Sequence, residues 1–119
     1  MLQKLSTSDA LHLWHRVSLH MVHDENPDLS MRQMAILLTI YLETPPHTVR
    51  GLAAKLNVSK PVITRALDTM GRYELVTRRR DENDKRNVLI QRTVEGSLFV
   101  ERMADIIVNQ FEYRNESAL

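Results

Sequence analysis

Apolar residues recur every three or four positions through most of the chain, and this spacing predicts helices. Five segments carry it, residues 8–23, 30–43, 48–56, 59–73 and 93–111. Each begins with a hydroxyl residue of the kind that accepts a hydrogen bond at a helix N-terminus. These expected caps are Ser8, Ser30, Thr48, Ser59 and Thr93. Gln33 follows Ser30 in capping-box spacing, and residues 114–119 are expected to fray.

The segments between these helices contain residues that end helices. Residues 23–28 form a polar loop with a proline, and Pro45 and Pro46 end the second helix because proline removes a backbone donor. Residues 57–59 leave room only for a tight turn, in which Asn57 tolerates left-handed geometry. The third and fourth helices are therefore expected to form a helix-turn-helix.

After the fourth helix the apolar residues alternate instead. This change predicts two short strands, residues 75–79 and 87–92, with the polar residues 80–86 as a hairpin tip. The predicted fold class is mainly α with a small β-wing, that is, a winged helix-turn-helix with flanking N- and C-terminal helices.

The composition fits one soluble domain. The 119 residues are 43% apolar and 26% charged, which is ordinary for a globular protein. The densest apolar stretch, residues 34–42, is too short to span a membrane, and polar residues 6–9 interrupt any secretion signal. Because there is no cysteine, disulfides and thiol chemistry are excluded, and a reducing cytoplasm is the expected location.

The charge is unevenly distributed along the chain. Residues 58–92 carry nine Lys or Arg and five Asp or Glu, a balance of +4, although the whole chain has only +1. Residues 1–31 and 93–119 are both net acidic. A basic centre of this kind favours a polyanionic partner such as DNA.

The fourth helix has an apolar rear and a polar front, as a helix that enters the major groove of DNA requires. The rear residues are Val62, Ile63, Ala66, Leu67 and Met70, and the front residues are Lys60, Pro61, Thr64, Arg65 and Asp68. Arg65 can donate two hydrogen bonds to a guanine edge, whereas Lys60 and Thr64 suit phosphates. The helix N-terminus at Ser59 offers free N–H donors to a phosphate. The alternative is a protein-binding helical hairpin with a solvated front.

The hairpin tip offers a cation for the minor groove, where arginine is favoured over lysine. Arg86 is the residue expected there, and Asp84 could fix its direction through an ion pair. Arg78, Arg79 and Arg80, expected at the base of the hairpin, could reach phosphates or be free surface charges.

Residues 75–86 resemble the wing of MarR-type transcriptional regulators, in which a Leu–Val pair precedes an arginine and an Asp-x-Arg ends the tip. Residues 93–96 resemble the Thr–acidic–Gly start of the next helix of that family. The pairs at 52–53, 58–59 and 64–65 match its helix-turn-helix. This resemblance implies that Arg86 is the minor-groove arginine, Asp84 its orienting partner and the helix from Ser59 the recognition helix.

The chain also departs from this family pattern. Arg92 stands where the family usually has an apolar residue, and family members are usually longer, with a further C-terminal helix in the dimer interface. We expect one domain over residues 1–119, with a DNA-binding core at about 30–92 and flanking helices at 8–23 and 94–112. Four apolar residues of the flanking helices exceed what one small core needs, which predicts pairing with a second copy. They are Leu11, Val22, Phe99 and Ile106.

The sequence therefore predicts a homodimeric, repressor-like regulator that binds a pseudo-palindromic DNA duplex, with a small-molecule effector left open. The alternative is a non-catalytic winged-helix module whose basic face binds an acidic protein. No catalytic residues, cofactor or membrane contact are expected, since the motifs of those functions are missing.

Four histidines share one face of the first helix, which raises the question of a metal site. They are His12, His15, His20 and His23. Zinc requires three or four ligands, and only Asp24 and Glu25 are nearby, so a solvated or interface-lining face is the preferred interpretation.

Overall fold

The computed structural model describes residues 4–24 and 27–117, with only the backbone for residues 114–117. It divides into two compact units, each with its own internal contacts. The winged-helix unit is residues 29–100, and the terminal-helix unit combines residues 1–28 with residues 101–119. Helix α5 (Val94–Ser117) contributes its first turns to the winged-helix unit and the remainder to the terminal-helix unit.

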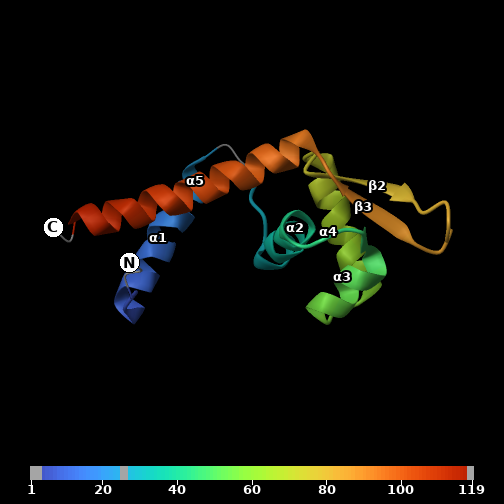
Figure 1. The fold of residues 1–119 in the computed structure, drawn as a ribbon, viewed down its shortest axis with the longest axis horizontal. Coiled ribbons are helices and arrows are strands. Elements are labelled where there is room, and N and C mark those ends of the chain that lie inside the picture. Colours follow the sequence, from blue (N-terminus) through green and yellow to red (C-terminus); the bar gives the residue numbers. More distant parts are fainter. Residues whose placement is uncertain (1–3, 25–26, 118–119) are drawn as a thin grey trace. The chain divides into compact units, whose positions relative to one another are not determined.

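Three helices and a three-stranded sheet build the winged-helix unit (Figure 1). The helices are α2 (Met31–Leu42), α3 (Val49–Leu56) and α4 (Lys60–Arg72). Their inward faces meet in one apolar core, which is expected to be the main source of stability of this unit. The core side chains that are fully excluded from solvent are Ile36, Leu37, Ile40, Ile63, Leu67 and Met70.

The predicted caps of this unit are confirmed where a hydroxyl accepts a backbone hydrogen bond. Ser30 accepts from the Gln33 N–H at 3.1 Å, and the Gln33 side chain accepts from the Ser30 N–H at 2.8 Å, which completes the capping box. Thr48 accepts from the Gly51 N–H at 2.9 Å. Thr93 accepts from the Gly96 N–H, also at 2.9 Å, so α5 begins where the sequence predicted.

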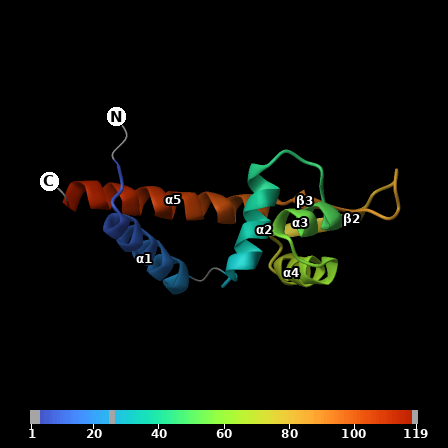
Figure 2. The same ribbon diagram turned by 90° about the horizontal axis from the view of Figure 1, so that it is seen from below.

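The sheet has the strand order β1-β3-β2 and is antiparallel throughout. Strands β2 (Val76–Arg80) and β3 (Val88–Arg92) form the predicted hairpin, and three of its four bounds are shifted by one residue. The hairpin loop projects beyond α3 and α4 (Figure 2). The sequence did not predict β1 (His47–Thr48), which pairs with Ile90 and Leu89. A two-residue strand has no periodicity to detect.

A tyrosine ties α2, the sheet and α5 together inside this unit. The Tyr41 hydroxyl donates to the Leu75 carbonyl at 2.7 Å and accepts from the Thr93 N–H at 2.9 Å. A Cβ at Gly96 would lie only 1.8 Å from this hydroxyl and 2.2 Å from the Leu75 oxygen. Glycine is therefore required at position 96 by close approach, in addition to its place in the resemblance noted above.

The terminal-helix unit contains α1 (Thr7–His23) and the C-terminal part of α5. The Arg16 guanidinium donates to the Gln110 carbonyl at 3.2 Å and lies 5.5 Å from the centre of the Tyr113 ring. The Gln110 side-chain nitrogen lies 2.9 Å from His20 Nε2. Polar contacts thus join the two helices of this unit, and Val17 is its one large apolar residue that is buried among those described.

Three predictions about the flanking helices need correction. Helix α1 is capped by Ser6, which accepts from the Asp9 N–H at 3.0 Å, so the cap comes before the predicted Ser8. Helix α5 continues past Phe111 to Ser117, where fraying was expected, and residues 118–119 lie outside the described residues. Phe99 is 1% exposed and belongs to the core of the winged-helix unit, so it is not a surface residue free to contact a second copy.

Candidate nucleic-acid interface

A left-handed asparagine sets the angle between α3 and α4. Asn57 ends α3 with φ 55° and ψ 50°, and the Val58 N–H donates to the Ala53 carbonyl at 3.0 Å. The chain then enters α4 at Ser59, whose side chain makes no capping hydrogen bond. The predicted tight turn is confirmed, and Ser59 is the N-cap residue by position only.

Helix α4 separates apolar from polar side chains as the sequence predicted. Its rear residues Ile63, Ala66, Leu67 and Met70 are buried, and Val62 is half-buried. The predicted contact residues Ser59, Lys60, Pro61, Thr64 and Arg65 are all exposed on the other side. No described residue forms an ion pair with Lys60 or Arg65, so both cations are open to a ligand.

The wing tip holds the predicted pair of Asp84 and Arg86. The Arg86 side chain donates from Nε to Asp84 Oδ1 at 3.1 Å and from Nη2 to Oδ2 at 3.3 Å. The Arg86 backbone N–H donates to the same carboxylate at 3.1 Å. The side chain of Arg86 nevertheless stays 80% exposed, so a fixed guanidinium projects into solvent.

This pairing also affects the titration of Asp84. The side-chain hydrogen bond from Arg86, followed by the one from its backbone N–H, lowers the pKa of the Asp84 carboxyl below its ordinary value. The positive charge of Arg50, on α3, lowers this pKa further. Arg50 was not expected in the site, because nothing in the sequence spacing indicates that a cation of α3 acts on the wing tip.

The three consecutive arginines of β2 differ in their surroundings. Arg78 Nη2 donates to Asp68 Oδ1 of α4 at 2.7 Å, so Arg78 is ion-paired. Arg79 and Arg80 are exposed and have no ion-pair partner among the described residues. Arg80 pairs with Val88 at the tip end of the hairpin, so the prediction that it lies at the base is wrong.

Arg92, where the sequence departs from the family pattern, caps the end of α2. Its Nε donates to the Ile40 carbonyl at 2.8 Å and its Nη2 to the Glu43 carbonyl at 2.9 Å. The guanidinium also lies 5.8 Å from the centre of the Tyr41 ring. A cation at the C-terminal end of a helix is stabilised by the free carbonyls and the helix dipole.

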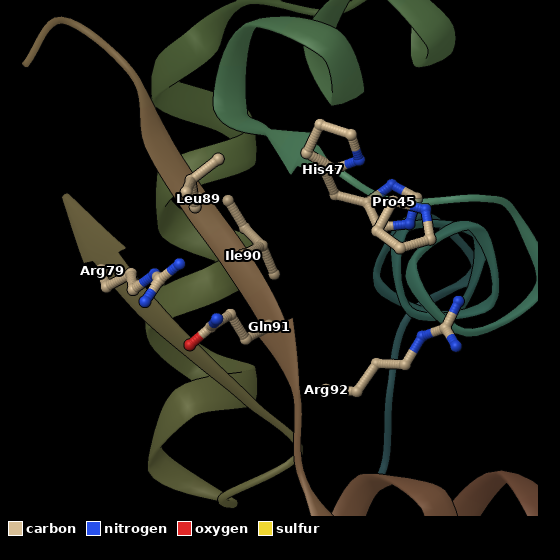
Figure 3. Close-up of a pocket in the computed structure, with 8 residues that line it drawn as sticks. Pro45, His47, Arg79, Leu89, Ile90, Gln91 and Arg92 are labelled. Atoms are coloured by element: carbon tan, nitrogen blue, oxygen red, sulfur yellow. The ribbon is translucent and has the colours of Figure 1, made fainter. Parts of the chain in front are cut away.

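A cavity of about 470 Å³ opens on the other face of the sheet (Figure 3). Arg79, Leu89 and Gln91 belong to the sheet face turned away from α4, and the loop residues Pro45 and Pro46 form the facing wall. Arg92 points out of the cavity toward the end of α2, and the buried His47 bonds to the Glu43 carbonyl at 3.2 Å. Arg79 is therefore the cation of this lining whose donors have no described partner.

Two histidines of α1, His12 and His20, have polar partners. His12 Nδ1 lies 2.8 Å from the Ser8 carbonyl oxygen, and His20 contacts Gln110 as described above. Within residues 4–24 and 27–117 no three His, Cys, Asp or Glu side chains are grouped to hold a metal ion. In the same part of the chain no helix combines the length and the apolar character that a membrane crossing needs.

Comparison with known proteins agrees with this geometry. The model of the MarR family matches residues 29–88, which is half of the chain. The chain belongs to the MarR family. Members of this family are transcriptional regulators and not enzymes.

The chain is also similar to individual proteins, and the solved structures show that it shares their fold. The organic hydroperoxide resistance transcriptional regulator of Bacillus subtilis is 37% identical over 73 residues, covering 61% of this chain and 48% of that protein. The chain thus spans about half the length of this curated relative. S. aureus MepR in complex with DNA superposes with a TM-score of 0.71 at 19% identity, covering 94% of this chain and 86% of that one. S. aureus MepR bound to ethidium bromide gives 0.72 at 21% identity, with coverage of 97% and 84%.

Proposed function

We propose that this MarR-family protein is a sequence-specific double-stranded DNA-binding regulator, acting as a repressor and as a homodimer on a pseudo-palindromic operator. The observation that carries the proposal is α4, which has a buried apolar rear and an exposed front with two unpaired cations. A helix of this kind enters the major groove and presents its N-terminal half to the bases.

Different side chains on the front of α4 contact the bases and the phosphates. Arg65, in the second turn of the helix, donates to the O6 and N7 atoms of a guanine. Lys60 and Thr64 bind phosphates, together with the free backbone N–H groups of the first turn after Ser59, to which Pro61 contributes no donor. These contacts fix the position of the helix along the duplex, while Arg65 reads the sequence.

The wing supplies the second contact with DNA. Arg86 inserts its guanidinium into a narrow, A·T-rich minor groove, where the negative potential is strongest. Asp84 holds this guanidinium in one direction before DNA arrives, so less side-chain entropy is lost on binding. Arg79 and Arg80, both exposed and unpaired among the described residues, add to the positive field of the wing.

The terminal-helix unit forms the interface with a second copy of the chain, and the resulting dimer binds a two-fold symmetric operator. Leu11 and Val22 are 72% and 74% exposed, and α1 offers little core of its own. Pairing with a symmetry mate buries such residues and places two recognition helices on successive major grooves.

We propose that a small molecule modulates binding, in keeping with the structure of S. aureus MepR bound to ethidium bromide. Whatever the signal, these 119 residues contain no cysteine, so a thiol-based response is not open to them. We propose the cytoplasm as location, and neither a cofactor nor a metal is part of the mechanism.

The test of the recognition helix compares two cations on its front. A duplex is first selected by the full chain from a random pool. Arg65→Ala is expected to cost about 1–3 kcal/mol on that duplex and to relax preference at one base pair. Lys60→Ala should weaken binding to selected and random DNA alike and reduce the salt slope by about one. Equal loss on both kinds of DNA for Arg65→Ala would remove its base-reading role.

The test of the wing uses the two members of the tip pair. Arg86→Lys keeps the charge but should bind the selected duplex clearly less well, because lysine fits a narrow groove poorly. Asp84→Ala removes a charge that repels DNA, so electrostatics alone predicts tighter binding, whereas a pre-organised Arg86 predicts weaker binding. We expect weaker binding at two salt concentrations, and tighter binding at both would contradict the assigned role of Asp84.

A further inference from the structure

Strand β2 lies at the edge of the sheet, so its position depends on few attachments. In the order β1-β3-β2, strand β3 is held by a strand on each side, whereas β2 pairs only with β3. Val76 anchors the start of β2 in the core, but every later residue of the strand is exposed. The outer part of the wing therefore needs another contact to keep its angle to the recognition helix.

The ion pair of Arg78 and Asp68 provides this contact. Arg78 pairs in register with the buried Ile90, so its side chain leaves the sheet on the face that packs against α4. There it meets Asp68 at 2.7 Å. The Arg78 side chain is 34% exposed, compared with 80% for Arg86, so the two wing arginines have different environments.

The position of Asp68 on α4 makes its charge hard to explain otherwise. Asp68 lies one turn after Thr64 on the same ridge, next to the front of the recognition helix. A carboxylate there repels the phosphates of DNA and reads only a cytosine edge. An ion pair with Arg78 of the wing accounts for a carboxylate at this position, whereas direct contact with DNA does not.

We infer that Asp68 is a positioning residue that fixes the wing to the recognition helix through Arg78, and that Arg78 is not a phosphate contact. This inference rests on the proposed function. The pair holds the relative angle of the two DNA-binding elements, so that α4 and Arg86 reach adjacent grooves together. Arg78 was expected from the sequence to contact a phosphate, and this inference instead makes it the partner that links the wing to α4 within the protein.

A double-mutant cycle on the full chain tests the inference. Asp68→Asn and Arg78→Ala are each expected to weaken binding to the selected duplex about three- to fivefold, and the double variant no more than either alone. Asp68→Glu keeps the carboxylate and should bind within about twofold of wild type. Arg78→Ala should leave the salt slope unchanged, because no phosphate contact is lost.

A matched control separates positioning from net charge. Glu43 forms an exposed ion pair with Lys55 between α2 and α3, in the same unit. Glu43→Gln removes one negative charge, as Asp68→Asn does, so both variants change the net charge by the same amount, and the gain from reduced repulsion of DNA should be at least as large for Asp68→Asn, which lies nearer the recognition front. Glu43→Gln should therefore bind as well as wild type or slightly better, while Asp68→Asn binds less well.

Contrary results are equally specific. If Asp68→Asn binds as tightly as Glu43→Gln, or if the effects of Asp68→Asn and Arg78→Ala add, the ion pair is not what positions the wing. A salt slope lowered by about one in Arg78→Ala would make Arg78 a phosphate contact.

If wild-type protein selected no duplex, the proposed function would fail separately. The contact between Asp68 and Arg78 is then tested in the free protein, by NMR measurement of the backbone amide chemical shifts of β2. Shifts there in Asp68→Asn and not in Glu43→Gln support it, and their absence overturns it.

Discussion

The two units of this chain differ in how much of their apolar surface they bury. In the winged-helix unit the inward residues of α2, α3, α4 and the sheet are almost wholly excluded from solvent, and Phe99 closes the core from α5. In the terminal-helix unit Val17 is buried, while Leu11, Trp14 and Val22 are more than half exposed. Both units expose some large apolar residues, but the first has an apolar core of its own, whereas the second buries little of its apolar surface within one copy.

The difference teaches where each function should be sought. DNA recognition needs side chains held by a rigid scaffold, and the winged-helix unit supplies one. The proposed dimer assigns association to the terminal-helix unit, because that unit lacks a core of its own. The following substitutions should therefore act differently in the two units.

The largest effect is expected at the close contact inside the winged-helix unit. Gly96→Ala forces a methyl group against the Tyr41 hydroxyl and the Leu75 carbonyl, and should lower the free energy of unfolding by about 3 kcal/mol or more. Gly71→Ala is the control, because a Cβ there meets nothing within 4 Å. Since Gly71 is helical, that change should raise the free energy of unfolding by up to about 1 kcal/mol. Urea denaturation measures the free energy of unfolding of both variants. Equal values for Gly96→Ala and Gly71→Ala would mean that the space around Gly96 is not tight.

The next effect concerns association through the terminal-helix unit. The double substitution Leu11→Ser and Val22→Ser should raise the dissociation constant of the dimer about 100-fold, since two apolar side chains per copy lose their burial. Leu42 and Val94 are equally exposed, at 73% and 75%, but belong to the winged-helix unit. Their double substitution to Ser should leave association nearly unchanged. Analytical ultracentrifugation without DNA decides, and a wild-type monomer at micromolar concentrations would contradict the dimer.

A smaller effect is expected at the end of α2. Arg92→Gln removes the cation that bonds to the Ile40 and Glu43 carbonyls, and should lower the free energy of unfolding by about 1–2 kcal/mol. Arg79→Gln, on the same sheet without a described partner, should change it by less than about 0.5 kcal/mol. Thermal denaturation of both variants compares them. Similar losses in the two would show that Arg92 is an ordinary surface charge.

The smallest effect is a shift in one titration. Arg86 lowers the pKa of Asp84, so the carboxylate should titrate below its ordinary value of 3.8. The contact is then complete above that value and is lost only as the pH falls through the lowered pKa. Binding through the wing should therefore not vary with the charge of Asp84 between about pH 5 and 8. Carboxyl carbon shifts by NMR measure the midpoint, and Arg86→Gln should return it toward 3.8.

Much of the fold could be predicted from the sequence because its signals are local. The capping box at Ser30, the left-handed Asn57 and the alternation in β3 each depend on residues close in the chain. The predictions were wrong where several residues could serve as the same helix cap, or where a contact joins residues far apart in the sequence. Ser6 and Ser8 can both cap α1, and sequence spacing cannot choose between two hydroxyl residues only two positions apart.

The candidate site was predictable to a similar degree. The exposed front of α4 follows from helical periodicity, and the contact of Asp84 with Arg86 spans two residues. The contact of Arg78 with Asp68 and the cap made by Arg92 join residues far apart in the sequence or on different elements. A single sequence contains no signal for such pairs, so Arg78 was expected to be free for phosphate.

The central claim is that the winged-helix unit recognises a particular DNA sequence. The most direct measurement is the ratio of dissociation constants of the full chain for its selected duplex and for a shuffled duplex of equal length and composition, at one fixed salt concentration. We predict a ratio of about 10³ or more in favour of the selected duplex. A ratio near one, with binding lost as salt is raised, would contradict the claim and leave a basic module that binds polyanions or acidic proteins without reading a sequence.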